Sequence, residues 1–426
     1  MGGDWLILAD DLTGAADGGI AFARRGVPSV VAWGDHRPSF EQGRGVLSYD
    51  VDSRGLSAED AAARHRNALD RLLAGGMPLF KKIDSTWRGQ PAAEIAACLA
   101  ALRERGGRGF AVLAPAFPAT GRTIVGGHVH VSGRPLEEAE VWRRDHSYAS
   151  ADLVAILASA GLAGEVLPLA AIRAGREELQ DSLRSLAERG DVVAICDAEA
   201  EDDLARIAAA TVSLPAATLY VGSGGFAHAL AEMAAGVGSS SATKPSLPAG
   251  PIRHGGTLVV VGTLAAMSRR AARRTVDEGH VRHVSVAPAL LLDSGATAAR
   301  GHLVVTLSAI LAAGDDAMVE VAVDDSPDLS IGHSLAVALA DLLHPVLPHA
   351  GALAATGGET AAALLSRFGV TSLRLVDEIE PGVCLGLTVG AVSLPVITKA
   401  GAFGDEDSLT RIIQHFRQLR HIGPTP

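Results

Sequence analysis

The segment 79–89 places charged and hydroxyl side chains directly after an apolar run, in the order Leu-Phe-Lys-Lys-Ile-Asp-Ser-Thr-Trp-Arg-Gly. The chain has four lysines, Lys81, Lys82, Lys244 and Lys399, against thirty-three arginines, and two of the four lie in this segment. Ammonium and guanidinium groups beside a carboxylate and two hydroxyls suit a site that binds a small, anionic, hydroxylated molecule. Taken alone, the segment could also be a surface turn with scattered charges.

Two more polar segments follow predicted strands. Asp10 and Asp11 come directly after the predicted strand 5–9, and Asp52 and Arg54 follow the predicted strand 46–50. A carboxylate at the end of a buried strand is costly unless a cation, a hydroxyl or a base compensates it. Asp11 or the nearby Thr13 is equally well explained as the N-cap of the next helix, whereas Asp10 has no such explanation.

Functional groups in open α/β sheets gather in the loops after the carboxyl ends of the strands. We therefore predict that Arg54, Lys82 and Arg88 converge on a carboxylate. We also predict that Asp10, Asp52 and Asp84 accept hydrogen bonds from hydroxyl groups. Such a pocket fits a sugar acid. The segment 114–127 is rich in Gly, Pro and Thr, and we expect no regular structure there. Its Arg122 is a candidate ligand or an exposed structural arginine.

The second half of the chain carries two glycine loops. A predicted strand runs into Gly357-Gly358-Glu359-Thr360, and another, ending at Thr398, runs into a loop with Lys399, Gly401 and Gly404. Glycines at a strand-to-helix turn let backbone amides approach a phosphate at the positive end of a helix. A tight turn with Glu359 in the first helical turn is the plainer alternative. The chain has no GxxxxGK[ST] loop, and segment 222–225 lacks the full GxGxxG spacing.

Short apolar runs alternate with longer segments of helical period, which predicts an α/β fold with mostly parallel sheets covered by helices on both faces. The length of 426 residues favours two domains. Residues 238–256 are rich in Gly, Ser and Pro and are predicted to be a linker. We therefore predict a substrate domain over 1–237 and a second, phosphate-handling domain over 257–426.

The composition limits the partners. A net charge of −11 argues against a nucleic-acid surface, so an acidic substrate must be caught by a local basic pocket. Cys98, Cys196 and Cys384 are far apart and are predicted to be buried thiols in a reducing compartment. We see no signal-like segment and no uncharged run long enough for a bilayer, and we expect a cytoplasmic protein with no membrane partner.

Five motifs together resemble the four-carbon acid sugar kinases, and the resemblance spans nearly the whole chain in the family's order. They are Ala9-Asp10-Asp11-Leu12-Thr13-Gly14-Ala15, Lys82-Ile83-Asp84-Ser85-Thr86-Trp87-Arg88-Gly89, Pro115-Ala116-Phe117-Pro118 with Gly121-Arg122-Thr123, Gly357-Gly358-Glu359-Thr360, and segment 399–407. The resemblance implies an N-terminal substrate domain and a C-terminal nucleotide domain with the active site in the cleft between them. It also implies ATP-dependent phosphorylation of the terminal hydroxyl of a tetronate or oxo-tetronate.

The resemblance and general phosphoryl-transfer logic assign roles to the residues. Asp10 or Asp84 would face the attacking hydroxyl as the catalytic carboxylate, and Mg²⁺ would bridge the phosphates of ATP on ligands not yet identified. The substrate would be bound by Asp11, Asp52, Arg54, Lys82, Ser85, Arg88 and Arg122. The nucleotide would be bound by Ser268, Gly357, Gly358, Glu359, Thr360, Lys399, Gly401 and Gly404.

The chain departs from the family where a Gly-Ser-Cys-Ser turn is usual. The turn reads Gly262-Thr263-Leu264-Ala265, with Ser268 at a position where the family has Thr, and Ala265 removes one nucleotide contact. Two alternatives stay open at this stage: a non-catalytic relative that binds sugar acids, and a hydroxy-acid dehydrogenase. A homodimer is possible.

Overall fold

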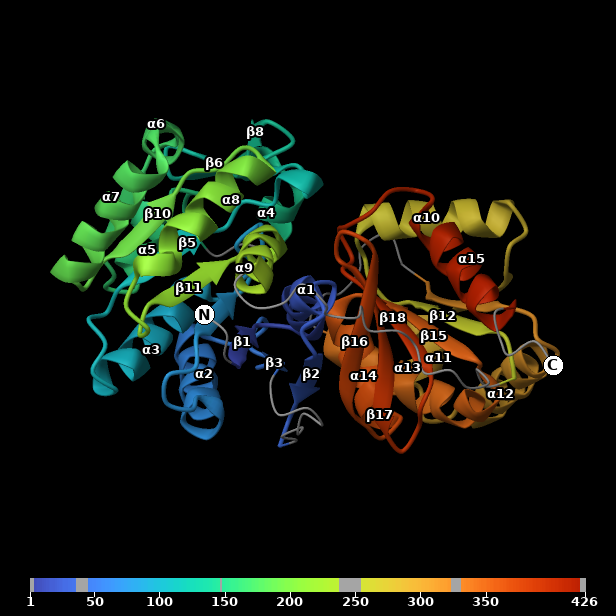
Figure 1. Cartoon of the computed structure of the whole chain (residues 1–426). Helices are drawn as coiled ribbons and strands as arrows, with labels where there is room; N and C mark the ends of the chain where they lie inside the picture. The colour runs from blue at the N-terminus through green and yellow to red at the C-terminus, as the bar shows by residue number, and fades with distance from the viewer. Residues whose placement is uncertain (1–3, 36–44, 146–147, 237–253, 323–330, 422–426) are drawn as a thin grey trace. The chain divides into compact units, whose positions relative to one another are not determined.

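The computed structural model describes residues 4–35, 45–145, 148–236, 254–322 and 331–421 (Figure 1). The contacts divide the chain into two compact units, Met1–Lys244 and Pro245–Pro426. The predicted linker 238–256 falls mostly outside the described residues, so the domain bounds given above remain predictions. No helix in the described ranges is both long and apolar enough to cross a membrane.

The first unit is built on one parallel sheet. Its strands lie in the order β2-β3-β1-β4-β11-β5-β10-β9, and each neighbouring pair is parallel. The strands are β1 (Trp5–Ala9), β2 (Ser29–Trp33), β3 (Val46–Asp50), β4 (Leu79–Lys82), β5 (Ala111–Ala114), β9 (Gly164–Leu167), β10 (Val193–Cys196) and β11 (Leu219–Gly222). The helices are α1 (Leu12–Ala23), α2 (Ala58–Leu72), α3 (Pro91–Glu104), α4 (Glu140–Asp145), α5 (Leu153–Ser159), α6 (Leu169–Ala174), α7 (Arg176–Arg189), α8 (Glu201–Ala210) and α9 (Gly224–Gly236).

Strand β1 lies at the point where the strand order of this sheet reverses. The chain leaves β1 through α1 toward β2, crossing β3, and leaves β3 through α2 toward β4, crossing β1 in the opposite direction. Because parallel crossovers are right-handed, α1 and α2 cover opposite faces, and a crevice opens at the carboxyl end of β1. Helix α1 packs on α9, and α2 packs on α3. The predicted site loops after β1, β3 and β4 therefore meet at this crevice.

Local signals in the sequence explain the helix starts next to these loops. The Asp11 side chain caps α1 by accepting a hydrogen bond from the Gly14 amide at 2.7 Å. The Ser57 side chain caps α2 by accepting a hydrogen bond from the Asp60 amide at 3.1 Å. Pro91 occupies the first turn of α3. The N-cap explanation of Asp11 is thus confirmed.

The expectation of irregular structure over 114–127 is wrong. This segment contains β6 (Arg122–Val125), which pairs antiparallel with β7 (His128–Val131), and β7 pairs with β8 (Arg134–Pro135) in a small separate sheet. Gly126 and Gly127, both with positive φ, form the tight turn between β6 and β7. The glycines that argued against regular structure are the residues that a hairpin turn requires.

The second unit has a mostly parallel sheet in the order β13-β14-β12-β15-β18-β17-β16. The first five strands are parallel, and β17 pairs antiparallel with both β18 and β16. The strands are β12 (Thr257–Val261), β13 (Arg282–Val286), β14 (Ala317–Val321), β15 (Ala352–Thr356), β16 (Val370–Glu380), β17 (Val383–Gly390) and β18 (Pro395–Lys399). The helices are α10 (Ala266–Asp277), α11 (Pro288–Leu292), α12 (Thr297–Ala312), α13 (Gly332–Leu343), α14 (Gly358–Arg367) and α15 (Ser408–His421). The α/β fold class predicted from the pattern is confirmed.

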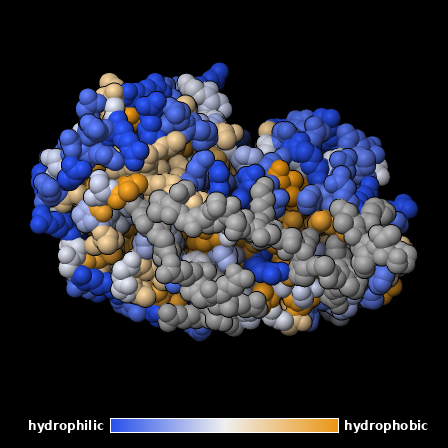
Figure 2. All heavy atoms as spheres, viewed as in Figure 1, coloured by the Kyte–Doolittle hydropathy of each residue, from blue (hydrophilic) through white to orange (hydrophobic). Residues whose placement is uncertain are grey.

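This second sheet also reverses its strand order, at β12. The chain leaves β12 through α10 toward β13, and leaves β14 through α13 toward β15, crossing β12. The carboxyl ends of β12, β15 and β18 are neighbours, so their loops gather at one edge of the sheet. Hydrophilic side chains predominate on the face of the molecule shown in Figure 2, as the charge content of the sequence suggests.

Candidate active site

Two arginines and three aspartates form a connected cluster at the carboxyl end of β1. Arg54 contacts both oxygens of Asp10, at 2.7 and 3.0 Å, and one oxygen of Asp11 at 2.5 Å. Arg88 contacts both oxygens of Asp84, at 3.0 and 2.8 Å, and a distance of 3.9 Å joins Arg54 to Asp84. The structure therefore brings together the predicted residues Asp10, Asp11, Arg54, Asp84 and Arg88.

The positive charges beside Asp84 and Asp10 keep both carboxyl groups ionised. Burial raises the pKa of Asp84, but Arg88 and Arg54 outweigh burial, and the pKa lies well below its usual value. Burial likewise opposes ionisation of Asp10, and Arg54 and Lys81 outweigh it, so the pKa of Asp10 is lowered. Both aspartates are carboxylates at neutral pH, and both arginines keep about a quarter of their side chains exposed to a ligand.

The loop between β4 and α3 has a strained backbone that aims these groups. Asp84 accepts hydrogen bonds from the Thr86 amide and the Thr86 hydroxyl. Trp87 is fully buried with φ +61°, a conformation that a bulky side chain rarely adopts. A Cβ on Gly89 would lie 3.4 Å from an oxygen of Asp10. This packing holds Asp84 and Arg88 against the loop of Arg54.

Two other predicted residues lie near the cluster. The Ser85 hydroxyl oxygen is buried and has no hydrogen-bond partner among the described residues, so it is available to a ligand. Arg122 donates to the Thr120 carbonyl. Burial lowers the pKa of Arg122, and the charges of Asp84 and Arg88 also act on it, which places its guanidinium near the cluster.

Lys82 and Asp52 do not converge with the rest. The Lys82 ammonium lies 3.1 Å from Asp17 of α1 and donates to the Ile83 carbonyl. Asp52 has φ +52° and a largely exposed side chain that contacts Arg64 of α2 at 2.9 Å. The left-handed turn directs Asp52 outward, which the sequence did not reveal.

A buried network that sequence reasoning missed supports the loop of Arg54. Glu94 of α3 contacts the Lys81 ammonium at 2.9 Å and accepts a hydrogen bond from Ser53 at 2.6 Å. His65 lies 4.0 Å away, and burial lowers its pKa to about 4, so it is neutral at pH 7. Glu94 stands in the first turn of α3, where an acidic residue is common and gives no local signal of this network. Ser53 precedes Arg54, so Glu94 fixes the position of the Arg54 loop.

We expect Glu94→Gln to lower the free energy of unfolding by about 3 kcal/mol, because it leaves the Lys81 charge buried and uncompensated. Urea denaturation measures this. Adding Lys81→Met to the variant should recover part of the loss. The matched control is Glu104→Gln at the exposed end of α3, where the pair with Arg66 should contribute less than about 1 kcal/mol. Equal losses for the two single variants would contradict the role of the network.

Asp50 is a second group that the sequence did not single out. It ends β3 and accepts a hydrogen bond from the Asp52 amide at 2.7 Å. Burial raises the pKa of Asp50 well above its usual value, and the Asp11 carboxylate adds to this effect. The cluster therefore combines ionised carboxylates with one carboxyl group that favours its neutral form.

In the second unit, the predicted glycine loops meet around Thr263. Gly357 has φ +92°, and a Cβ there would lie 3.4 Å from Cβ of Thr263. A Cβ on Gly401 would clash with the Thr263 hydroxyl, and one on Gly262 would clash with Thr360. Only glycine fits these close approaches, so the loops after β12, β15 and β18 form one continuous backbone surface.

Two helices point uncapped N-termini at this surface. The N-cap residues are Ala265 for α10 and Gly357 for α14, and neither has a side chain that accepts a hydrogen bond from the first turn. Free amides at a helix N-terminus attract anions. Thr360 is buried, whereas Glu359 is exposed and lies 3.4 Å from His333. Gly404 has φ +80° in the turn that precedes α15.

Lys399 lies fully buried beneath the third loop. Its ammonium donates to the Ser268 hydroxyl at 2.8 Å, and Ser268 donates to the Gly401 carbonyl at 2.7 Å. Burial lowers the pKa of Lys399 to about 8. This chain of hydrogen bonds ties α10 to the Gly401 loop.

The lowered pKa of Lys399 predicts a specific pH dependence of stability. The unfolded chain keeps this proton up to about pH 10.5 and the folded chain releases it near pH 8, so stability rises with pH between these values. We expect Lys399→Met to remove this rise. Urea denaturation at pH 7.5 and 9.5 measures it, with the exposed Arg367→Met as control. An unchanged difference between the two pH values in Lys399→Met would contradict the assignment.

Comparisons with known proteins agree with the division into two units. Residues 5–230 match the family model of a sugar-binding N-terminal domain, and residues 258–409 match that of a nucleotide-binding C-terminal domain. The chain is 41% identical to a D-threonate kinase of Cupriavidus necator over 98% of this chain and 99% of the relative. It is 33% identical to a D-threonate kinase of Bordetella bronchiseptica over 99% of each.

A solved structure from Salmonella typhimurium has the same fold. Its TM-score is 0.78 with 22% identity, and the match covers 96% of this chain and 98% of that chain. The two matched domains identify a protein with one sugar-binding unit and one nucleotide-binding unit. The chain is a carbohydrate kinase of the four-carbon acid sugar kinase family.

Proposed function

We propose that the chain transfers the γ-phosphate of ATP to the terminal hydroxyl of a four-carbon sugar acid, with threonate as the first candidate. The names of the 41% and 33% identical relatives support threonate. The observation that carries the proposal is the pair of bidentate arginine–aspartate contacts at the carboxyl end of β1, formed by Arg54 with Asp10 and Arg88 with Asp84.

In this proposal the substrate carboxylate binds between Arg54 and Arg88. A guanidinium group matches the two oxygens of a carboxylate and can keep a second, protein carboxylate on its other edge. The substrate hydroxyls donate to Asp10 and Asp84, and the unpartnered Ser85 hydroxyl and nearby Arg122 complete the pocket. Lys82 acts indirectly, by holding the Ile83 carbonyl, and Asp52 makes no direct contact.

The carboxylate that faces the attacking hydroxyl is Asp10 or Asp84. Both stay ionised because arginines outweigh the effect of burial. Such carboxylates are weak bases, but phosphoryl transfer passes through a loose transition state that depends on positioning and charge neutralisation. The carboxylate therefore orients the hydroxyl and accepts its proton late in the transfer.

The phosphates of ATP would contact the backbone around Gly357, Gly358 and Gly401. Lys399 and Ser268 support the third loop from beneath rather than reaching the phosphate. The described residues contain no group of three or more His, Cys, Asp or Glu that could hold a metal. Mg²⁺ needs only one or two carboxylates when phosphates and water supply its other ligands.

Glu380 fits such a partial metal site. One of its carboxylate oxygens is buried without a hydrogen-bond partner among the described residues, while Arg411 binds the other. A Cβ on Gly404 would lie 2.7 Å from the unpartnered oxygen, which places it beside the third loop. Glu380 and the nearby Asp405 would hold Mg²⁺, which would neutralise phosphate charge when bound.

An assay of ATP consumption with a panel of four-carbon acids tests the function. D-threonate, L-threonate, the two erythronates and 3-oxo-tetronates are each offered with Mg-ATP, and we expect the highest kcat/KM with one threonate isomer. A nicotinamide absorbance assay on the same panel tests for a dehydrogenase. Thermal stabilisation by an acid without any ATP turnover would favour the non-catalytic alternative and contradict this proposal.

We place the reaction in the cytoplasm. Cys98, Cys196 and Cys384 are all buried thiols. Burial raises the pKa of Cys98 to about 12 and also raises that of Cys196, so neither is a reactive thiolate. Cysteines kept as buried thiols in a protein of this size fit a reducing compartment.

A further inference from the structure

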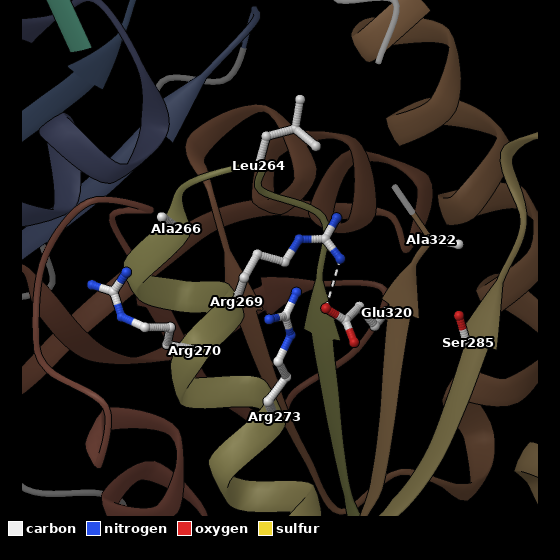
Figure 3. A pocket seen from close by; sticks show the side chains of 8 residues that line it. All are labelled: Leu264, Ala266, Arg269, Arg270, Arg273, Ser285, Glu320 and Ala322. Carbon is white, nitrogen blue, oxygen red and sulfur yellow. Dashed lines mark hydrogen bonds and ion pairs between the residues drawn. The ribbon is translucent and has the colours of Figure 1, made fainter. Parts of the chain in front are cut away.

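A pocket in the second unit lies on the side of β12 away from the glycine loops. It has a volume of about 570 Å³ and is lined by residues of α10, β13, β14 and the turn after β12 (Figure 3). The lining residues are Leu264, Ala266, Arg269, Arg270, Arg273, Ser285, Glu320 and Ala322. Three arginines against one glutamate make this a basic pocket in a chain of net charge −11.

Arg269 offers an unused donor to this pocket. Its Nε donates to the Thr263 carbonyl at 3.0 Å, and one terminal nitrogen contacts Glu320 at 2.6 Å. The other terminal nitrogen, Nη2, is buried and has no hydrogen-bond partner among the described residues. A buried guanidinium donor without an acceptor is costly, and an oxyanion would satisfy it.

Arg273 adds a second donor group one helical turn further along α10. No ion pair or hydrogen bond joins Arg273 to any described residue, and Figure 3 shows its guanidinium beside the Arg269 side chain and the Glu320 carboxylate. Arg270 points elsewhere in the same view, and it contacts Glu406 at 3.1 Å. Arg269 and Arg273 thus lie on the pocket side of the helix.

Glu320 offsets only one of the three arginine charges that line the pocket. One of its oxygens accepts from Arg269, and the other lies 3.1 Å from Nε2 of His283. The carboxylate is therefore occupied by protein partners on both oxygens and keeps the Arg269 side chain in place. The Ser285 hydroxyl provides a further polar group at the end of β13.

We infer that this pocket binds a phosphate group through Nη2 of Arg269 and the guanidinium of Arg273. Two planar guanidinium groups match the oxygens of a phosphate better than those of a neutral ligand. The cavity is larger than a single phosphate needs, so the phosphate belongs to a larger molecule or shares the pocket with water. It comes either from the nucleotide of the proposed kinase reaction or from a separate phosphorylated ligand.

Titration of the full chain with inorganic phosphate by calorimetry tests the inference. We expect Arg273→Met to weaken phosphate binding by at least about 10-fold, because the variant loses a charge-assisted hydrogen bond to the phosphate. Arg273 is exposed and unpaired, so its loss should leave the fold intact. The matched control is Arg274→Met on the same helix, where the side chain contacts Glu278 and Asp407 instead.

Kinetics with ATP separate the two sources of the phosphate. A rise of KM for ATP in Arg273→Met, with phosphate inhibiting competitively against ATP, assigns the pocket to the nucleotide. Loss of phosphate binding with KM for ATP unchanged assigns it to a separate phosphorylated ligand. Equal phosphate affinity in the wild type, Arg273→Met and Arg274→Met overturns the inference. Absence of ATP turnover with every four-carbon acid would instead overturn the proposed function and leave the phosphate titration interpretable.

Discussion

The variant Asp84→Asn is expected to lower kcat by at least about 10²-fold at saturating acid, because the amide cannot accept the hydroxyl proton. The amide would also turn a donor toward Arg88, which now contacts both Asp84 oxygens. KM for the acid should rise as well, since Arg88 loses its fixed orientation. Steady-state kinetics with varied acid at saturating ATP separate the two effects.

The matched control for Asp84→Asn is Asp70→Asn in the same unit. Asp70 is exposed and contacts Arg66 and Arg105 on the surface, so its replacement should leave kcat unchanged. A near-normal kcat in Asp84→Asn would remove Asp84 from the catalytic position and leave Asp10 as the carboxylate that faces the hydroxyl. In that case we expect the Asp10→Asn variant to show the loss of kcat instead.

The free energy of unfolding should depend on pH through the ionisation of Asp84, and the lowered pKa gives the direction of this dependence. Because the pKa of Asp84 is lowered well below 3.8 in the folded chain, its carboxylate stabilises the fold above that pH. This contribution is lost as the pH falls below 3.8 toward the folded pKa. Asp84→Asn should therefore weaken the dependence of the free energy of unfolding on acid pH, which urea denaturation between pH 3 and pH 6 measures.

Replacing Gly358 with Val should raise KM for ATP by at least about 10-fold, which corresponds to a loss of about 1.4 kcal/mol in binding. Gly358 is the first residue of α14, next to Gly357 with φ +92° and the Thr263 turn. A branched side chain here would block the approach of a phosphate to the backbone amides. KM for the acid should change much less.

Gly301→Val provides the control for Gly358→Val. Gly301 lies in α12 of the same unit, and a Cβ there would meet nothing within 4 Å. The control accounts for the general cost of valine in a helix. A larger effect of Gly358→Val on KM for the acid than on KM for ATP would mean that the roles of the two units are interchanged.

Much of the fold could be predicted from local patterns. The predicted strands 5–9 and 46–50 have the bounds that the structure shows, and Ser57 and Pro91 are local signals at the starts of α2 and α3. Such signals depend on hydrophobic period and on capping groups close in sequence. The prediction of irregular structure over 114–127 was wrong because glycines fit an irregular loop and a tight hairpin turn equally well.

The candidate site could be predicted only in part. Asp10, Arg54, Asp84 and Arg88 were found because all follow strand ends, and parallel neighbours bring such ends together. Lys82 and Asp52 follow strands too, yet the structure turns them to Asp17 and Arg64. In β4, successive side chains point to opposite faces, so Lys81 reaches Glu94 of α3 while Lys82 reaches α1.

By itself the sequence determined which chemical groups stand at the strand ends, the α/β class, and the glycines that let three loops approach one another. Tertiary structure decided which polar groups become partners: Glu94 with Lys81, Lys399 with Ser268, and Arg269 with Glu320. The first contact joins β4 to the next helix, α3, and the other two join elements far apart in the chain. Ionisation and direction of a side chain depend on burial and on the nearest opposite charge, and folding alone sets both.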